Sequence, residues 1–89
     1  MIAFTKDEQD EIYEYIDRTR GMSIEGKDIN CFENLYRIIS HEDTSLASVN
    51  EIIDYIEQIN LLKEAFQAFG VNDCPIFDKL VLYLEKILE

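Results

Sequence analysis

The sequence predicts an all-α protein, folded as a compact bundle of four main helices plus one short helix. Apolar residues recur at intervals of three and four over most of the chain, which is the spacing of one helix face. Only one proline and three glycines interrupt the chain, and 89 residues suit a single domain with one core. We expect helices at residues 6–20, 28–40, 46–59, 61–69 and 75–88.

The first expected helix, residues 6–20, begins with a recognisable cap. Thr5 and Glu8 form a capping-box pattern, in which each side chain accepts a hydrogen bond from the other residue's backbone amide. Residues 21–27 contain two glycines and should form a loop. The residues that we expect on the buried face of this helix are Ile12, Tyr13 and Ile16.

The second expected helix, residues 28–40, carries a wide apolar face. This face covers nearly half of the helix circumference, which predicts burial on more than one side. A polar break follows at residues 41–44. The residues of the face are Ile29, Phe32, Leu35, Tyr36 and Ile39.

Residues 46–69 contain two apolar sets that differ in phase. At about 100° per residue, the two sets lie on nearly opposite faces of one straight helix, which cannot bury both against one core. We therefore expect a break near Asn60, a good N-cap residue, and a stop at Gly70. The first set is Val49, Ile52, Ile53, Ile56 and Ile59, and the second is Leu61, Leu62, Ala65, Phe66 and Phe69.

The last expected helix begins at Pro75, because proline is favoured in the first turn. Leu82 points away from its apolar face and could support a homo-oligomer. The residues of that face are Ile76, Phe77, Leu80, Val81, Leu84, Ile87 and Leu88.

The charge balance is strongly acidic, with 19 Asp and Glu against eight Lys and Arg and a net charge of −11. Such a surface repels nucleic acid, which is bound largely through basic side chains, and it repels anionic membranes. It attracts cationic proteins and speeds encounter with them. The charge therefore predicts a cationic protein partner, with general solubility as the alternative explanation.

The sequence also suggests where the protein resides. The N-terminal segment lacks the basic region and long apolar run of a signal peptide. No apolar stretch approaches the roughly 20 residues that a membrane-spanning helix needs. We therefore expect a cytoplasmic protein with reduced thiols.

Few residues could support catalysis. His41 is the one histidine, and at the end of a helix it can act as a cation that interacts with the helix dipole. A single histidine without a suitably placed cysteine cannot build a zinc site. Cys31 and Cys74 are too far apart in sequence for a Cys-x-x-Cys motif. We therefore expect a non-enzymatic protein with no metal and no cofactor.

The carboxylates of the first expected helix form a pattern of their own. Five of them fall within about 120° of arc, and only Arg18 interrupts them, where it can pair with Glu14. Tyr15 flanks them and is expected to be partly exposed. Carboxylates steer a cationic partner and aromatic rings anchor it, so we predict a partner-binding surface, with an ordinary solvated helix face as the alternative. The five are Asp7, Asp10, Glu11, Glu14 and Asp17.

A second candidate site is Ser45, which stands at an expected helix start and precedes a leucine. This segment resembles the Asp-Ser-Leu attachment motif of acyl carrier proteins, with Thr44 in place of the aspartate. The resemblance implies a 4'-phosphopantetheine arm on Ser45. The alternative is that Ser45 or Ser48 is a helix N-cap. The other residues that carry the resemblance are Leu46, Phe32, Leu35 and the closing segment 82–88.

These observations favour a non-enzymatic inhibitor of the immunity or antitoxin type, which neutralises a cationic partner such as a toxin nuclease. One alternative is an acyl-carrier-like protein modified on Ser45. Another is a nucleic-acid-mimicking or phage-encoded inhibitor of a host defence protein. An adaptor that forms homo-oligomers through Leu82 is a third.

Overall fold

The computed structural model describes residues 2–71 and 74–89 and confirms the all-α fold. Within those residues, four α-helices alternate with a short hairpin and one turn of 3-10 helix. The helices are α1 (Lys6–Arg18), α2 (Cys31–His41), α3 (Val49–Ala68) and α4 (Pro75–Leu88). The remaining elements are the strands β1 (Ser23–Ile24) and β2 (Lys27–Asp28) and the 3-10 helix η1 (Thr44–Leu46).

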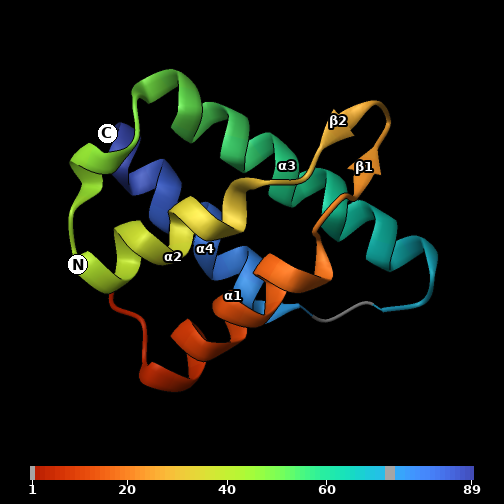
Figure 1. Ribbon diagram of the computed structural model, residues 1–89, viewed down its shortest axis with the longest axis horizontal. Helices are drawn as coiled ribbons and strands as arrows, with labels where there is room; N and C mark the ends of the chain where they lie inside the picture. The colour runs from red at the N-terminus through yellow and green to blue at the C-terminus, as the bar shows by residue number, and fades with distance from the viewer. Residues whose placement is uncertain (1, 72–73) are drawn as a thin grey trace.

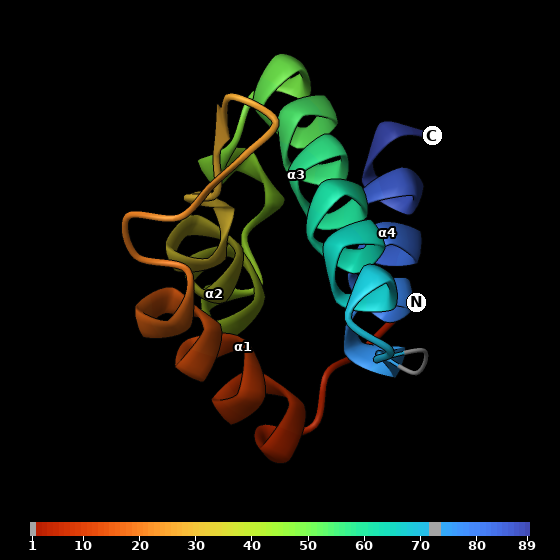
Figure 2. The same ribbon diagram turned by 90° about the vertical axis from the view of Figure 1, so that its right-hand side faces the viewer.

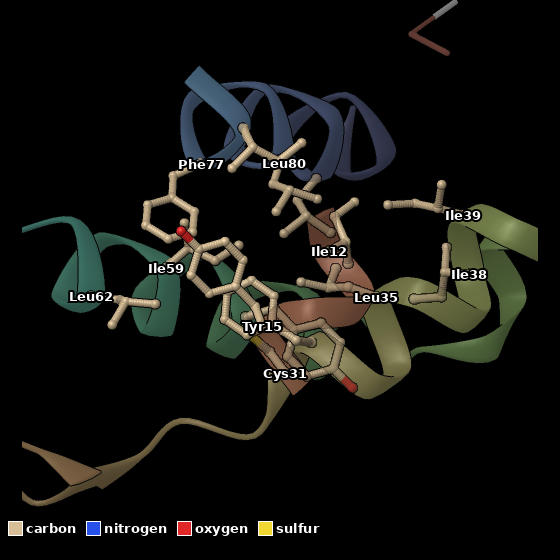
Figure 3. Packing of buried hydrophobic residues seen from close by; sticks show 14 of the residues in the cluster. Ile12, Tyr15, Cys31, Leu35, Ile38, Ile39, Ile59, Leu62, Phe77 and Leu80 are labelled. Atoms are coloured by element: carbon tan, nitrogen blue, oxygen red, sulfur yellow. The ribbon is translucent and has the colours of Figure 1, made fainter. Parts of the chain in front are cut away.

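The helices form two layers that enclose one core. Figure 2 shows α1 beside α2 on one side and α3 beside α4 on the other. Side chains from all four helices fill the space between the layers (Figure 3). The fully buried residues with the largest side chains include Ile12, Phe32, Leu35, Ile38, Ile52, Ile59, Leu62, Phe77, Leu80 and Leu84.

Helix α1 begins with the predicted capping box. The Thr5 hydroxyl accepts a hydrogen bond from the Glu8 amide at 3.2 Å, and a Glu8 carboxylate oxygen accepts one from the Thr5 amide at 2.8 Å. The helix ends at Arg18, two residues earlier than expected. There the buried Thr19 hydroxyl donates a hydrogen bond to the backbone carbonyl of Tyr15 at 2.6 Å.

The β1–β2 hairpin occupies most of the loop expected at residues 21–27 and extends one residue beyond it, to Asp28. It lies beside α3 in Figure 1. The strands pair in antiparallel register, with Ile24 opposite Lys27. Glu25 and Gly26 lie between them with φ values of 52° and 80°. Two successive residues of positive φ are what a two-residue type I′ turn requires. The glycine supplies this at little cost, whereas Glu25 does so without the usual Asn or Asp.

Helix α2 begins at Cys31, three residues later than expected, and Gln58 of α3 caps it. The Gln58 side-chain oxygen accepts hydrogen bonds from the amides of Asn30 and Cys31, both at 2.9 Å. Its amide nitrogen donates to the Asn30 side chain at 3.0 Å and to Asp54 at 2.7 Å. Ile29 is buried as predicted but precedes the helix.

Helix α3 is one continuous helix of 20 residues, so the predicted break near Asn60 is wrong. Buried residues recur at intervals of three and four on both sides of Asn60, so one face of the helix stays buried throughout. Ser48 caps the start of the helix. The two apolar sets differ in phase because they include residues that lie outside the core: Val49 is 64% exposed, Ile53 51% and Phe69 87%. The buried face carries Ile52, Tyr55, Ile59 and Leu62, with Phe66 half-buried at its end.

Helix α4 matches the predicted boundaries 75–88, with Pro75 in its first turn and Leu82 exposed. Two ion pairs attach it to other helices. Lys79 contacts both carboxylate oxygens of Glu8 in α1, at 2.8 and 3.0 Å, and its ammonium lies 4.8 Å from the centre of the Phe4 ring. Asp78 pairs with Lys63 of α3.

Candidate partner-binding surface

The five carboxylates predicted to line one side of the first helix are all exposed on α1. We call this set the acidic face. Helix α1 buries its opposite side, with Ile12 and Tyr15, in the core. The five carboxylates therefore face solvent. Its members are Asp7, Asp10, Glu11, Glu14 and Asp17.

Ion pairs within the chain neutralise part of the acidic face. Five carboxylates against three cations leave a net charge of −2. All six paired side chains are at least 60% exposed, and exposed pairs of this kind contribute little stability because water screens them. A partner's cations could therefore replace the local ones at small cost. The pairs are Lys6–Asp10 at 3.7 Å, Glu14–Arg18 at 3.3 Å and Asp17–Arg20 at 2.7 Å.

Tyr15 does not edge this surface: it is only 8% exposed, so its expected partial exposure is wrong. Its ring stacks on Phe32 of α2 with 5.2 Å between centroids. It also lies 5.0 Å from the ring of Phe77 in α4 (Figure 3). Burial raises the pKa of its hydroxyl. The inward stripe of α1 runs through Ile12, Tyr15 and Thr19, with steps of three and four residues. Tyr15 therefore holds α1 in the fold and offers no ring to a partner.

Tyr13, which sequence analysis assigned to the buried face, is instead 57% exposed. Its ring meets Tyr36 of α2 edge to face, with 5.1 Å between centroids. The two rings line an open cavity of about 330 Å³ between α1 and α2, which we call the α1–α2 groove. The position of Tyr13, three residues after Asp10 and four before Asp17, is the sequence signal that would have placed it beside the acidic face. The groove is lined by Tyr13, Ile16, Asp17, Arg20, Glu33 and Tyr36.

Ser45 lies exposed in η1, three residues before the cap of α3. Its hydroxyl donates to a carboxylate oxygen of Asp43 at 2.6 Å, and its backbone amide donates to the same oxygen at 3.0 Å. These two hydrogen bonds hold the pKa of Asp43 below its ordinary value. Ser48 forms the capping box with Glu51, so the interpretation of Ser48 as a helix N-cap is confirmed.

Three further residues have chemically active side chains. His41 is the exposed last residue of α2. Cys31 is fully buried, and burial raises the pKa of its thiol to about 12. Cys74 is half-buried at the start of α4. Among residues 2–71 and 74–89, no group of three His, Cys, Asp or Glu side chains is arranged to hold a metal ion.

Within the part of the chain that the structure describes, no helix combines the length and the apolar character needed to cross a lipid bilayer. Comparisons of the chain with protein-family models, with curated proteins and with solved structures found no match.

Proposed function

We propose that this protein is a non-enzymatic inhibitor that binds and neutralises a cationic partner protein, as an immunity protein or antitoxin does with a toxin nuclease. The observation that carries the proposal is the acidic face, which presents five exposed carboxylates on one side of a single helix. Tyr13, exposed beside them, adds an aromatic ring of the kind enriched at binding hot spots.

Electrostatics favours this function in two ways. A net charge of −11 accelerates encounter with a cationic protein, and the effect weakens as salt screens it. The carboxylates can accept paired hydrogen bonds from arginine, which gives orientation as well as attraction. The same features support a nucleic-acid-mimicking inhibitor, whose partner would be a nucleic-acid-binding protein of the host. The identity of the captured partner distinguishes the two.

The experiment uses three tagged forms of the protein as baits in extracts of its source cells. One is native, one carries Asp10→Lys with Glu14→Lys on the acidic face, and one carries Glu64→Lys with Glu85→Lys on α3 and α4. Each double substitution changes the net charge from −11 to −7, so the control matches the variant in total charge.

We expect the native and control baits to retain the same basic protein and the acidic-face variant to lose it. The purified partner should associate with the variant roughly tenfold more slowly at low salt, and the difference should shrink as salt rises. Adding the native protein should suppress the partner's own activity. Equal binding by all three forms, with no dependence on salt, would exclude the acidic face as the interface.

A further inference from the structure

The α1–α2 groove combines an aromatic wall with opposed charges. Tyr13 and Tyr36 meet edge to face, and Tyr13 is 57% exposed, so a face of its ring is open to solvent. Ring faces attract cations, arginine more often than lysine, because of their negative quadrupole. The cavity between the helices, about 330 Å³, has room for one long side chain.

The charges around the groove do not balance. Asp17 and Glu33 contribute two carboxylates, whereas Arg20 contributes one cation. Arg20 pairs with Asp17 at 2.7 Å, and Glu33 has no ion pair among the residues that the structure describes. One additional monovalent cation would neutralise the groove.

Arg20 is the cation that already lines the groove. Its guanidinium pairs with Asp17, and its side chain is 75% exposed. An exposed pair three residues apart in sequence adds little stability, so an incoming cation can share or take over the carboxylate. A guanidinium also suits this site better than an ammonium, because it is planar, stacks on aromatic rings and has five donors to divide between two carboxylates.

We propose that the α1–α2 groove receives one arginine side chain of the partner protein, with its guanidinium between Asp17 and Glu33 and its plane against Tyr13. This inference rests on the proposed function and names the partner chemistry that one part of the interface selects. The acidic face steers the partner electrostatically, and the groove then fixes its register through a single inserted side chain.

The test uses N-acetyl-arginine amide as the probe, with N-acetyl-lysine amide as its comparison, in an NMR titration that follows the tyrosine ring signals. The native protein is compared with Glu33→Gln, which removes a carboxylate of the groove, and with Glu64→Gln, which removes an exposed carboxylate of α3 outside both the groove and the acidic face. Both sites are exposed, so both variants should fold, and thermal melts verify this.

We expect the arginine probe to shift the ring signals of Tyr13 and Tyr36 more than those of Tyr55 and Tyr83. Glu33→Gln should weaken the fitted affinity roughly threefold, and Glu64→Gln should leave it unchanged. Shifts of equal size at all tyrosines, the same response to the lysine probe, or identical titrations of native and Glu33→Gln protein would overturn the proposal. The probe titration needs no partner protein, so its result is independent of the bait experiment. The groove can prove not to bind arginine while the acidic face still binds the partner, and the groove can bind arginine while the acidic face does not bind a partner.

Discussion

The side-chain oxygen of Gln58 accepts a hydrogen bond from the backbone N–H of Cys31 at 2.9 Å, so a buried residue of α3 caps the first turn of α2. Helix N-termini leave amides without partners inside the helix, and a local Ser, Thr, Asp or Asn usually satisfies one of them. Here the local residue, Asn30, makes no side-chain cap to the helix. The cap comes instead from a residue 27 positions away in sequence.

Replacing Gln58 with leucine should destabilise the protein by about 2–4 kcal/mol, because a buried amide and a part-buried amide at the start of α2 lose their acceptor. The measurement is urea unfolding followed by circular dichroism. Gln67→Leu, at an exposed position of the same helix, is the control and should change stability by less than about 0.5 kcal/mol. Equal stability of the two variants would show that the cap contributes nothing.

Asn60→Ala tests whether α3 is continuous. Inside a helix, alanine is the better residue, so the free energy of unfolding should rise by a few tenths of a kcal/mol, up to about 0.7. If Asn60 capped a separate helix, the same change would instead destabilise the protein by about 1 kcal/mol. The sign of the shift in the urea midpoint decides between them, and Asn50→Ala, another exposed asparagine of α3, provides a comparison.

The helices of this fold could be predicted from sequence wherever the apolar pattern coincided with the core. It did so over most of α4, whose boundaries and outward Leu82 were both correct, although Leu88, predicted on the buried face, is 38% exposed. In α3 it did not, because Val49 and Ile53 are apolar residues that the fold leaves in solvent. Apolar character alone cannot separate a buried isoleucine from an exposed one, and exposed apolar residues are common on protein surfaces.

The candidate site was predictable in part for a similar reason. Carboxylates are costly to bury, so their pattern reliably identified the exposed side of α1. Tyrosines have an apolar ring and a polar hydroxyl and occupy either environment, and the assignments of Tyr13 and Tyr15 were therefore interchanged. The α1–α2 groove depends on how α2 packs beside α1, a tertiary contact that helical spacing within one segment does not contain.

The Glu8–Lys79 ion pair should make stability depend on pH in the acid range. The hydrogen bond from Lys79, followed by that from the Thr5 amide, lowers the pKa of Glu8 from its ordinary 4.5. A carboxylate with a lowered folded pKa contributes stability that is fully present above the ordinary value and is lost as the pH falls through the folded value. The free energy of unfolding should therefore decline as the pH falls below 4.5.

Glu8→Gln isolates this contribution, because glutamine can still accept the hydrogen bond from Thr5 but carries no charge for Lys79. Urea unfolding between about pH 5 and pH 3 should show a shallower decline in this variant than in the native protein. Glu64→Gln, at an exposed position of α3, should retain the native slope. Parallel curves for native and Glu8→Gln protein would contradict the assignment.

The two thiols should differ sharply in reactivity. Burial raises the pKa of Cys31 to about 12 and leaves its side chain without solvent contact, so it holds almost no thiolate at neutral pH. A disulfide reagent such as DTNB should therefore modify only the half-buried Cys74 in the native protein and both thiols in urea. In Cys74→Ala the native reaction should disappear, and rapid modification of that variant would show that Cys31 is accessible.

The carrier alternative has a direct test on Ser45. We expect the intact mass of the protein to remain unchanged after co-expression with a phosphopantetheinyl transferase. The reason is that the Ser45 hydroxyl, in the 3-10 helix η1, donates a hydrogen bond to the Asp43 carboxylate. An authentic acyl carrier protein in the same cells serves as the positive control. A gain of one phosphopantetheine arm that Ser45→Ala abolishes would support the carrier function instead.

The burial of Tyr15 bears on how ordered helix α1 is before any partner binds. Its ring packs against both Phe32 and Phe77 in the core, so α1 cannot rotate or detach without drawing an aromatic side chain out of the core. The backbone that carries the acidic face is therefore already ordered before association. Binding to a prearranged helix sacrifices less conformational entropy than binding that first has to order one. Tyr15, which was expected to touch the partner, instead anchors this helix from inside the core.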